Sequence, residues 1–273
     1  MLRKLSQTIG AVLLAVTLQS ASAITITNFF DTDPGWTGAN NTTSGNSYGY
    51  SSGTSVAGGS PGEVGGTLAR SSVENYYADT NMGGLVGGYF TLNDPLIASG
   101  KFDATNLATM NNNVLIGHRS AGLVDHSGLG LGVFEFSTTH VRVGALFERP
   151  NGTLQLSALS AMPIDQNSTF SYSYDPTFNG GVGFLGRLTV TVMTNAALFN
   201  TFTLDISTAD RATGARFDAW GIGGTIINSI PTTHGDVFID DVIYTAVPEP
   251  TALAWLGLVA VMLRRRRAHK QHD

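Results

Sequence analysis

Acidic side chains are the residues of this chain that could break glycosidic bonds, a reaction that needs two carboxylates facing each other across a cleft. Glu135 stands alone in its apolar segment, where alternation predicts an outward-facing strand residue. Glu63, Glu74 and Asp79 could converge in space, but their spacing is not diagnostic of a catalytic pair. The carboxylates therefore do not predict a hydrolase.

Histidine and serine give no catalytic pattern either. His118, His126, His140 and His234 form no His-x-x-x-His pair, and the chain has no cysteine, so a zinc site is not predicted. Serine is abundant, but we expect no strained strand-to-helix elbow that would present it as a nucleophile. We predict solvated or core histidines, no catalytic residues and no enzyme activity.

Aromatic residues are candidates for a different chemistry, the binding of sugar rings. The apolar C–H face of a sugar stacks on a π surface, while neighbouring polar side chains satisfy its hydroxyl groups. Trp36, Tyr76, Tyr77 and Trp220 are the candidates for this glycan contact. The same residue types also fill protein cores, and both interpretations stay open.

Two pairs of aspartates predict a structural calcium ion. Asp31 and Asp33 follow the first expected strand, and Asp240 and Asp241 lie in the last one. First and last strands of an antiparallel sandwich are often neighbours, and one of two consecutive strand residues must face inward. An inward carboxylate needs a partner, and Ca²⁺ accepts several carboxylate and carbonyl oxygens. The alternative is a hydrogen-bonded turn carboxylate whose neighbour lies in solvent.

Short alternating segments must position these residues. No part of residues 24–246 sustains the helical period of 3.6, and turns rich in Gly, Pro and Asn separate the segments. This pattern predicts one all-β domain, a two-sheet antiparallel jelly-roll sandwich. The expected strands cover residues 24–27, 48–52, 88–92, 114–118, 130–136, 141–147, 170–174, 188–192, 202–206, 216–222 and 237–245.

Composition limits the partners of this domain. Without cysteine, its stability must come from core burial and hydrogen bonds, with or without metal ions. Seven of the 15 basic residues lie in the two chain ends, which leaves eight basic against 18 acidic residues, a charge near −10. Such a surface repels nucleic-acid phosphates and suits neutral glycans or cations. Nucleic acid is therefore not an expected partner.

The N-terminus has the features of a secretion signal. Arg3 and Lys4 precede an apolar segment at residues 9–18, and Ala21 and Ala23 provide the small residues that signal peptidase needs. We expect residues 1–23 to form a signal helix that is removed on export.

The C-terminus, residues 247–273, has three parts in a fixed order. Val247, Pro248, Glu249 and Pro250 come first, then twelve apolar residues at 252–263, then Arg264, Arg265, Arg266 and Arg267. The prolines exclude a helix and leave an extended segment that a protease can grip. A short transmembrane helix follows, with its arginines on the cytoplasmic side. Because a spanning helix usually needs about 20 residues, a transient span is expected.

These three parts resemble the PEP-CTERM sorting signal of Gram-negative bacteria. The resemblance covers about the last 25 residues of the chain. It implies that an exosortase-type transpeptidase recognises Pro248-Glu249-Pro250, removes the helix and passes the protein from the inner membrane to the cell surface or an exopolysaccharide matrix.

Two short segments of the domain resemble known jelly rolls. Residues 236–245, with their paired aspartates, are similar to the last strand of carbohydrate-binding and laminin-G-like domains. Residues 61–79 are similar to a segment of concanavalin-like domains in exported bacterial proteins. The Glu-x-Asp-x-x-Glu spacing of concanavalin-class glucanases is absent. The resemblance implies the jelly-roll topology rather than a particular ligand.

We therefore expect an exported, exosortase-processed protein of the cell surface or extracellular matrix with lectin-like polysaccharide binding. The alternatives are a divergent polysaccharide-active enzyme and a purely structural envelope protein. Expected partners are the exosortase-type transpeptidase, signal peptidase, exopolysaccharide and, transiently, the inner membrane.

Overall fold

The structure is a computed structural model that describes residues 23–43, 45–58, 61–69, 73–82, 88–105, 113–122, 125–178, 184–195, 197–225 and 234–246. The predicted signal helix, Ala21, the sorting motif at 247–250, the apolar run and the arginine cluster at 264–267 lie outside the described residues. Among the described residues, no helix has the length and apolar character needed to cross a membrane.

Strands make up almost all of the described secondary structure. The only helix in the described ranges is a single turn, α2 (Thr208–Arg211). The strands are β1 (Ile24–Asn28), β2 (Thr37–Ala39), β3 (Ser47–Ser51), β4 (Glu63–Ala69), β5 (Asn75–Asp79), β6 (Phe90–Thr91), β7 (Leu96–Thr105), β8 (Asn113–Arg119), β9 (Gly128–Ser137), β10 (His140–Glu148), β11 (Leu154–Leu156), β12 (Ser160–Pro163), β13 (Ser168–Asp175), β14 (Phe184–Thr194), β15 (Ala197–Ser207), β16 (Arg216–Phe217), β17 (Ala219–Gly224) and β18 (His234–Ala246).

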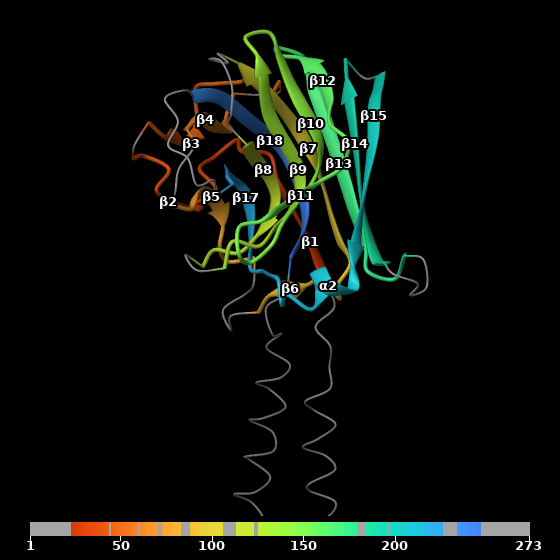
Figure 1. The fold of residues 1–273 in the computed structure, drawn as a ribbon. Helices are drawn as coiled ribbons and strands as arrows, with labels where there is room; N and C mark the ends of the chain where they lie inside the picture. Colours follow the sequence, from red (N-terminus) through yellow and green to blue (C-terminus); the bar gives the residue numbers. More distant parts are fainter. Residues whose placement is uncertain are drawn as a thin grey trace, which may run out of the picture.

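Two antiparallel sheets face each other as a sandwich (Figure 1). The first has the order β15-β14-β13-β7-β18-β4-β3, with β1 also paired to β18. The second has the order β11-β10-β9-β8-β17-β5-β2, with β12 also paired to β10. This arrangement confirms the predicted two-sheet antiparallel sandwich and is consistent with a jelly roll.

Alternation along each strand places the core between the sheets. In β13, residues Phe170, Tyr172 and Tyr174 are buried, and the residues between them are exposed. The neighbouring strands β14 and β15 repeat this pattern in register, so their apolar residues pack on the same side. Alternation in the sequence therefore predicted these strands correctly.

A hydrogen-bonded chain crosses the core between the two sheets. The indole Nε1 of Trp220 donates to the Tyr172 hydroxyl at 3.0 Å, and that hydroxyl lies 2.6 Å from Nδ1 of His118. The Nε2 of His118 lies 2.9 Å from the carbonyl of Thr245. Since a carbonyl only accepts, Nε2 carries the proton and Nδ1 accepts from Tyr172. Burial lowers the pKa of His118 to about 4, which keeps the ring neutral.

The first and last strands are neighbours, as predicted. β1 pairs antiparallel with β18, from Ile24 opposite Ala246 to Asn28 opposite Val242. A bulge interrupts the pairing of β18 with β7 after Asp240, where Asp241 has a φ of 48°. The bulge leaves Asp240 buried and turns Asp241 outward to Lys101.

Candidate functional site

A set of buried polar side chains lies on the outer face of the second sheet. Along β8, Val114, Ile116 and His118 point into the core, so Leu115 and Arg119 point to the other face. Tyr76 of β5 packs outside the main core as well. We call Glu74, Tyr76, Arg119 and His126 the Arg119 cluster.

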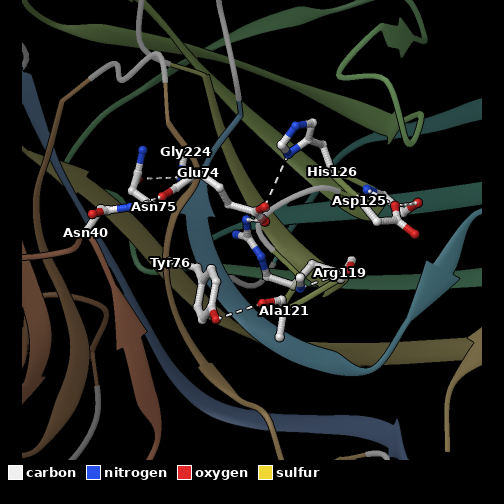
Figure 2. Close-up of polar contacts among 12 residues, drawn as sticks. Asn40, Glu74, Asn75, Tyr76, Arg119, Ala121, Asp125, His126 and Gly224 are labelled. Atoms are coloured by element: carbon white, nitrogen blue, oxygen red, sulfur yellow. Dashed lines mark hydrogen bonds and ion pairs between the residues drawn. The ribbon is translucent and has the colours of Figure 1, made fainter.

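Glu74 is the centre of this cluster (Figure 2). Its Oε1 accepts a hydrogen bond of 2.7 Å from Nη2 of Arg119, and its Oε2 lies 3.2 Å from Nδ1 of His126. The guanidinium carbon of Arg119 lies 4.9 Å from the centre of the Tyr76 ring. One carboxylate thus holds a guanidinium on one oxygen and an imidazole on the other.

Burial differs sharply among the members of the cluster. The side chains of Glu74 and Arg119 are each 3% exposed, whereas that of His126 is 21% exposed. His126 is therefore the member of the cluster that faces solvent. Breaking a buried ion pair costs about 3–5 kcal/mol, because the remaining charge is left uncompensated.

Arg119 has hydrogen-bonding capacity to spare. Its Nε and Nη1 are buried and have no partner among the residues that the structure describes. Its Nη1 lies over β17, 2.1 Å from the position that a Cβ at Gly223 would take. The same Cβ would lie 2.4 Å from the backbone carbonyl of Asn75, so a side chain at residue 223 would displace the guanidinium and also clash with the neighbouring strand.

The loop after β8 holds the cluster in place. The Tyr76 hydroxyl donates to the carbonyl of Ala121 at 3.1 Å, and the amide of Ala121 donates to Oδ1 of Asp218 at 2.7 Å. Oδ1 of Asp125 accepts from both the amide and the hydroxyl of Ser127, at 2.9 and 2.5 Å. These bonds fix both ends of the turn that carries His126.

The chain before β5 positions Glu74. The side-chain amide of Asn40 donates to the carbonyl of Glu74 at 2.7 Å. Asn75 points to the opposite side of the strand, where its Oδ1 accepts from the Tyr48 hydroxyl at 2.8 Å and the Gly224 amide at 3.0 Å. The backbone that carries Glu74 is thus held by Asn40 at its own carbonyl and through the bonds of its neighbour Asn75.

A second buried carboxylate, Glu148, shares this face. Gly128 of β9 pairs with Arg119 on one side and with Glu148 of β10 on the other. Directly paired residues point to the same face of a sheet. Glu148 is 3% exposed, and its Oε2 lies 3.7 Å from the position that a Cβ at Gly128 would take. Because Gly128 lies between them and has no side chain, Arg119 and Glu148 share one surface of the sheet.

The cluster can orient a proton-transfer group. Glu74 holds Nδ1 of His126, which leaves the Nε2 of the ring for a ligand, and Arg119 holds Glu74 in turn. Burial is the main cause that raises the pKa of the Tyr76 phenol, so the phenol stays a hydrogen-bond donor at neutral pH. The Tyr76 hydrogen is already donated to the carbonyl of Ala121, so His126 is the member whose Nε2 can form a hydrogen bond with a ligand oxygen.

The four predicted aromatic residues do not form one platform, which corrects that prediction in part. Trp220 is fully buried and stacks on Tyr244 with ring centres 4.5 Å apart, so it cannot contact a sugar in this structure. Trp36 and Tyr77 are half-buried and lie 6.0 Å apart against the core. Tyr76 points to the opposite face of β5 and belongs to the Arg119 cluster.

The predicted calcium residues include one inward and one outward aspartate. Asp240 is 1% exposed, and burial is the main cause that raises its pKa to about 6, while Asp241 forms an ion pair with Lys101. Asp31 is exposed, and Oδ1 of Asp33 accepts from the amide of Gly35. In the described part of the chain, no three His, Cys, Asp or Glu residues are grouped to hold a metal.

The other acidic candidates have structural partners. Glu63 accepts from the amides of Val56 and Ala57 at 2.9 and 2.8 Å, and Asp79 accepts from the Tyr244 hydroxyl at 2.6 Å. Glu135 is half-buried in β9. Of the acidic residues considered from the sequence as a catalytic pair, only Glu74 belongs to the cluster.

The structure places the histidines and a serine motif as follows, and His126 corrects the expectation of solvated or core histidines. His118 belongs to the core chain and His126 to the cluster, while His140 contacts the Thr139 hydroxyl at 2.9 Å. Ser47 is the centre of a Gly-x-Ser-x-Gly segment at residues 45–49. It begins β3, and β4 is the next element, so no strand-to-helix elbow is formed there.

Sequence reasoning missed Arg119 and did not single out His126. Glu74 lies 45 residues from Arg119 and 52 from His126, so no local spacing joins them. The signal that could have found Arg119 is its position as a charged residue at the end of an apolar strand. A buried charge of this kind needs a partner.

No protein-family model and no curated protein sequence matches the chain. Solved structures that are similar to it include a protein of unknown function from Shewanella oneidensis MR-1, with 12% identity, 86% of this chain and 92% of that chain covered, and a TM-score of 0.49. They also include the lectin UEA-II in complex with galactose (9% identity, 82% and 98% covered, TM-score 0.43) and the alginate lyase Aly36B (9%, 70% and 83%, 0.40). TM-scores below 0.5 assign no function to this chain.

Proposed function

We propose that this chain is an exported protein of the cell surface or extracellular matrix that binds polysaccharide through the Arg119 cluster. The observation that carries the proposal is His126, whose side chain is 21% exposed while its Nδ1 is held by Glu74, which the buried Arg119 holds in turn. An imidazole fixed in this way at the surface suits an oxygen-rich ligand. Polysaccharides present many such oxygens.

The other cluster members suit the same ligand. Tyr76 is 6% exposed and packs against the Arg119 guanidinium, with its hydroxyl fixed by Ala121, so it supports the site from beneath. Sugar sites use a few polar groups that are held in fixed positions. The imidazole of His126, held by Glu74, is such a group at the solvent-facing side.

In this proposal, the two chain ends determine where in the cell the protein is delivered. Residues 1–23 direct export, and residues 247–273 hold the protein briefly in the inner membrane until an exosortase-type transpeptidase acts at Pro248-Glu249-Pro250. The protein then joins the cell surface or an exopolysaccharide matrix. The distribution of charge and apolar residues at the ends supports this order.

Binding to a glycan array that includes the host's own exopolysaccharide tests the proposal. Arg119→Gln and His126→Gln should weaken binding about tenfold or more, since a hydrogen bond to a charged group contributes about 1.5–3 kcal/mol. His140→Gln is the matched control, because His140 is hydrogen-bonded to the Thr139 hydroxyl and lies opposite Ser137, at the other end of β9 from Gly128, the residue paired with Arg119. Unchanged binding in folded Arg119→Gln protein would remove the cluster from this function.

A polysaccharide-active enzyme is the second candidate, and two observations favour it. Glu74 orients His126 as a base would be oriented, and Glu148 places a second buried carboxylate on the same face. Reducing-sugar release from common glucans and the host polysaccharide, abolished by Glu74→Gln or Glu148→Gln, would promote this candidate. Binding without any product would favour the first.

A further inference from the structure

Strand β15 ends the first sheet and has a long free edge. It runs for eleven residues, pairs with β14 on one side, and lies at the border of the molecule (Figure 1). No described strand pairs with its other side. A free edge presents unpaired amides and carbonyls that another chain can use.

Three residues direct their backbone groups to this edge. The amide of Thr201 donates to Oδ1 of Asn200 at 2.8 Å, and the carbonyl of Asp205 accepts from Nε2 of Gln155 at 3.0 Å. Neither bond belongs to the pairing with β14. Because the backbone groups of alternate residues point to the same side, Thr203 faces the edge as well.

The molecule's own side chains cover only part of the edge. By this alternation the carbonyl of Thr201, both backbone groups of Thr203 and the amide of Asp205 point away from β14, and no turn or loop hydrogen bond within the described ranges reaches them. Gln155 comes from β11 of the opposite sheet, and β12 contributes a hydrogen bond of 2.8 Å from Asn200 to Ser160. Two donors and two acceptors stay open, centred on Thr203.

The sequence of β15 does not prevent pairing. Natural edge strands often carry lysine or proline to block association, and Ala197–Ser207 contains neither. Its one charged residue, Asp205, is paired with Arg187 of β14 at 2.5 and 2.9 Å. The edge therefore carries little net charge to repel an identical edge.

We propose that a second copy of this chain pairs with β15 in antiparallel orientation about a two-fold axis at Thr203. In this register, Thr203 faces Thr203 of the other copy, and Asp205 faces Thr201. The partner strand takes the places of the Gln155 and Asn200 side chains at the Asp205 carbonyl and the Thr201 amide, so these two side-chain bonds open when the dimer forms. The open amides of Thr203 and Asp205 meet the open carbonyls of Thr203 and Thr201. No like charges face each other, and the first sheets of the two copies become one continuous sheet.

Sedimentation of the purified protein across the micromolar range tests this inference. The expected result is a reversible dimer. Hydrogen exchange adds a local readout, because the amides of Thr203 and Asp205 should be protected in the dimer and lose protection on dilution. A monomer at every concentration would overturn the proposal.

Two variants at one position separate the edge from other interfaces. Thr203→Pro removes the central amide, which an edge strand tolerates, and should give a monomer. Thr203→Val keeps the amide and should stay dimeric. A folded Thr203→Pro protein that remains a dimer would contradict pairing at this edge. If Thr203→Pro fails to fold, the exchange of the wild-type amides decides the question.

Discussion

At the scale of single residues, buried charge is the feature that most affects this molecule. Arg119 and Glu74 neutralise each other beneath the surface, and His126 connects the pair to solvent. Asp103 and Asp240 form no ion pair within the described ranges, and burial raises the pKa of each to about 6. The first pair suits binding, whereas the two aspartates reduce stability at neutral pH.

Asp240→Asn should raise the thermal midpoint at pH 7.5 in the presence of a chelator. The folded pKa of about 6 lies above the ordinary 3.8, so the stability from this group is fully present below pH 3.8 and is lost as pH rises through 6. The variant has no carboxylate to ionise, so its advantage should shrink at pH 5 and disappear only below pH 3.8. Asp241→Asn is the control, because Asp241 is paired with Lys101 at the surface. A lower midpoint for Asp240→Asn at pH 7.5 would contradict this account.

The same variants test the proposed calcium ion at Asp240 and Asp241, with Asp31 or Asp33 as further ligands. Bound calcium stabilises the folded state by mass action. If the ion binds, millimolar calcium should raise the wild-type midpoint and the gain should be lost in Asp240→Asn. A wild-type midpoint that is the same in calcium and in chelator would remove the ion.

At the scale of elements, glycine determines how closely strands and side chains approach. Gly223 of β17 leaves room for the Arg119 guanidinium, and Gly62, with a φ of 122°, lies where a Cβ would come within 2.2 Å of the Phe30 carbonyl. Gly128 separates Arg119 from Glu148. These positions explain why strands rich in glycine can carry charged residues on one face.

Gly223→Ala should destabilise the fold by about 1–3 kcal/mol, because overpacking forces side chains and backbone to shift. The added methyl would lie 2.1 Å from Nη1 of Arg119 and 2.4 Å from the carbonyl of Asn75. Urea unfolding measures the change. Gly53→Ala is the matched control, since no atom lies within 4 Å of its added Cβ. Equal midpoints for the two variants would show that Arg119 is not held against β17.

The elements also show what could be predicted from the sequence. Strict alternation of apolar and polar residues predicted β13, β14 and β15, because one face of each strand is buried and the other is exposed. The bulge at Asp241 was not predicted, because a residue with positive φ there has no local signal such as glycine. The Arg119 cluster was not predicted, because pairing of β5, β8 and the following loop brings together residues 45 and 52 positions apart.

At the scale of the whole molecule, the proposed function depends on the β-sandwich and on the proposed processing of both chain ends. The pairing of β1 with β18 brings Ile24 opposite Ala246, so both borders of the domain meet at one strand pair. The end of the predicted signal peptide and the start of the predicted sorting signal are therefore joined to neighbouring points of the fold. Removal of both would leave the domain at residues 24–246.

Glu249→Ala should block release from the inner membrane, because Glu249 with its flanking prolines is the only helix-incompatible element beside the apolar run. Cell fractionation followed by mass spectrometry of the C-terminus measures this. The variant should accumulate in the membrane fraction with its arginine tail intact. Normal amounts of tail-free variant at the surface would contradict the sorting signal.

Polysaccharide binding at the Arg119 cluster is the central claim, and the imidazole resonances of His126 test it most directly. His126 is the solvent-facing member of the cluster, whereas His140 lies at the start of β10 with Thr139 as its neighbour. Adding the polysaccharide selected on the array should shift the His126 resonances in proportion to saturation and leave those of His140 unchanged. Saturable binding that leaves the His126 resonances unmoved would contradict the account.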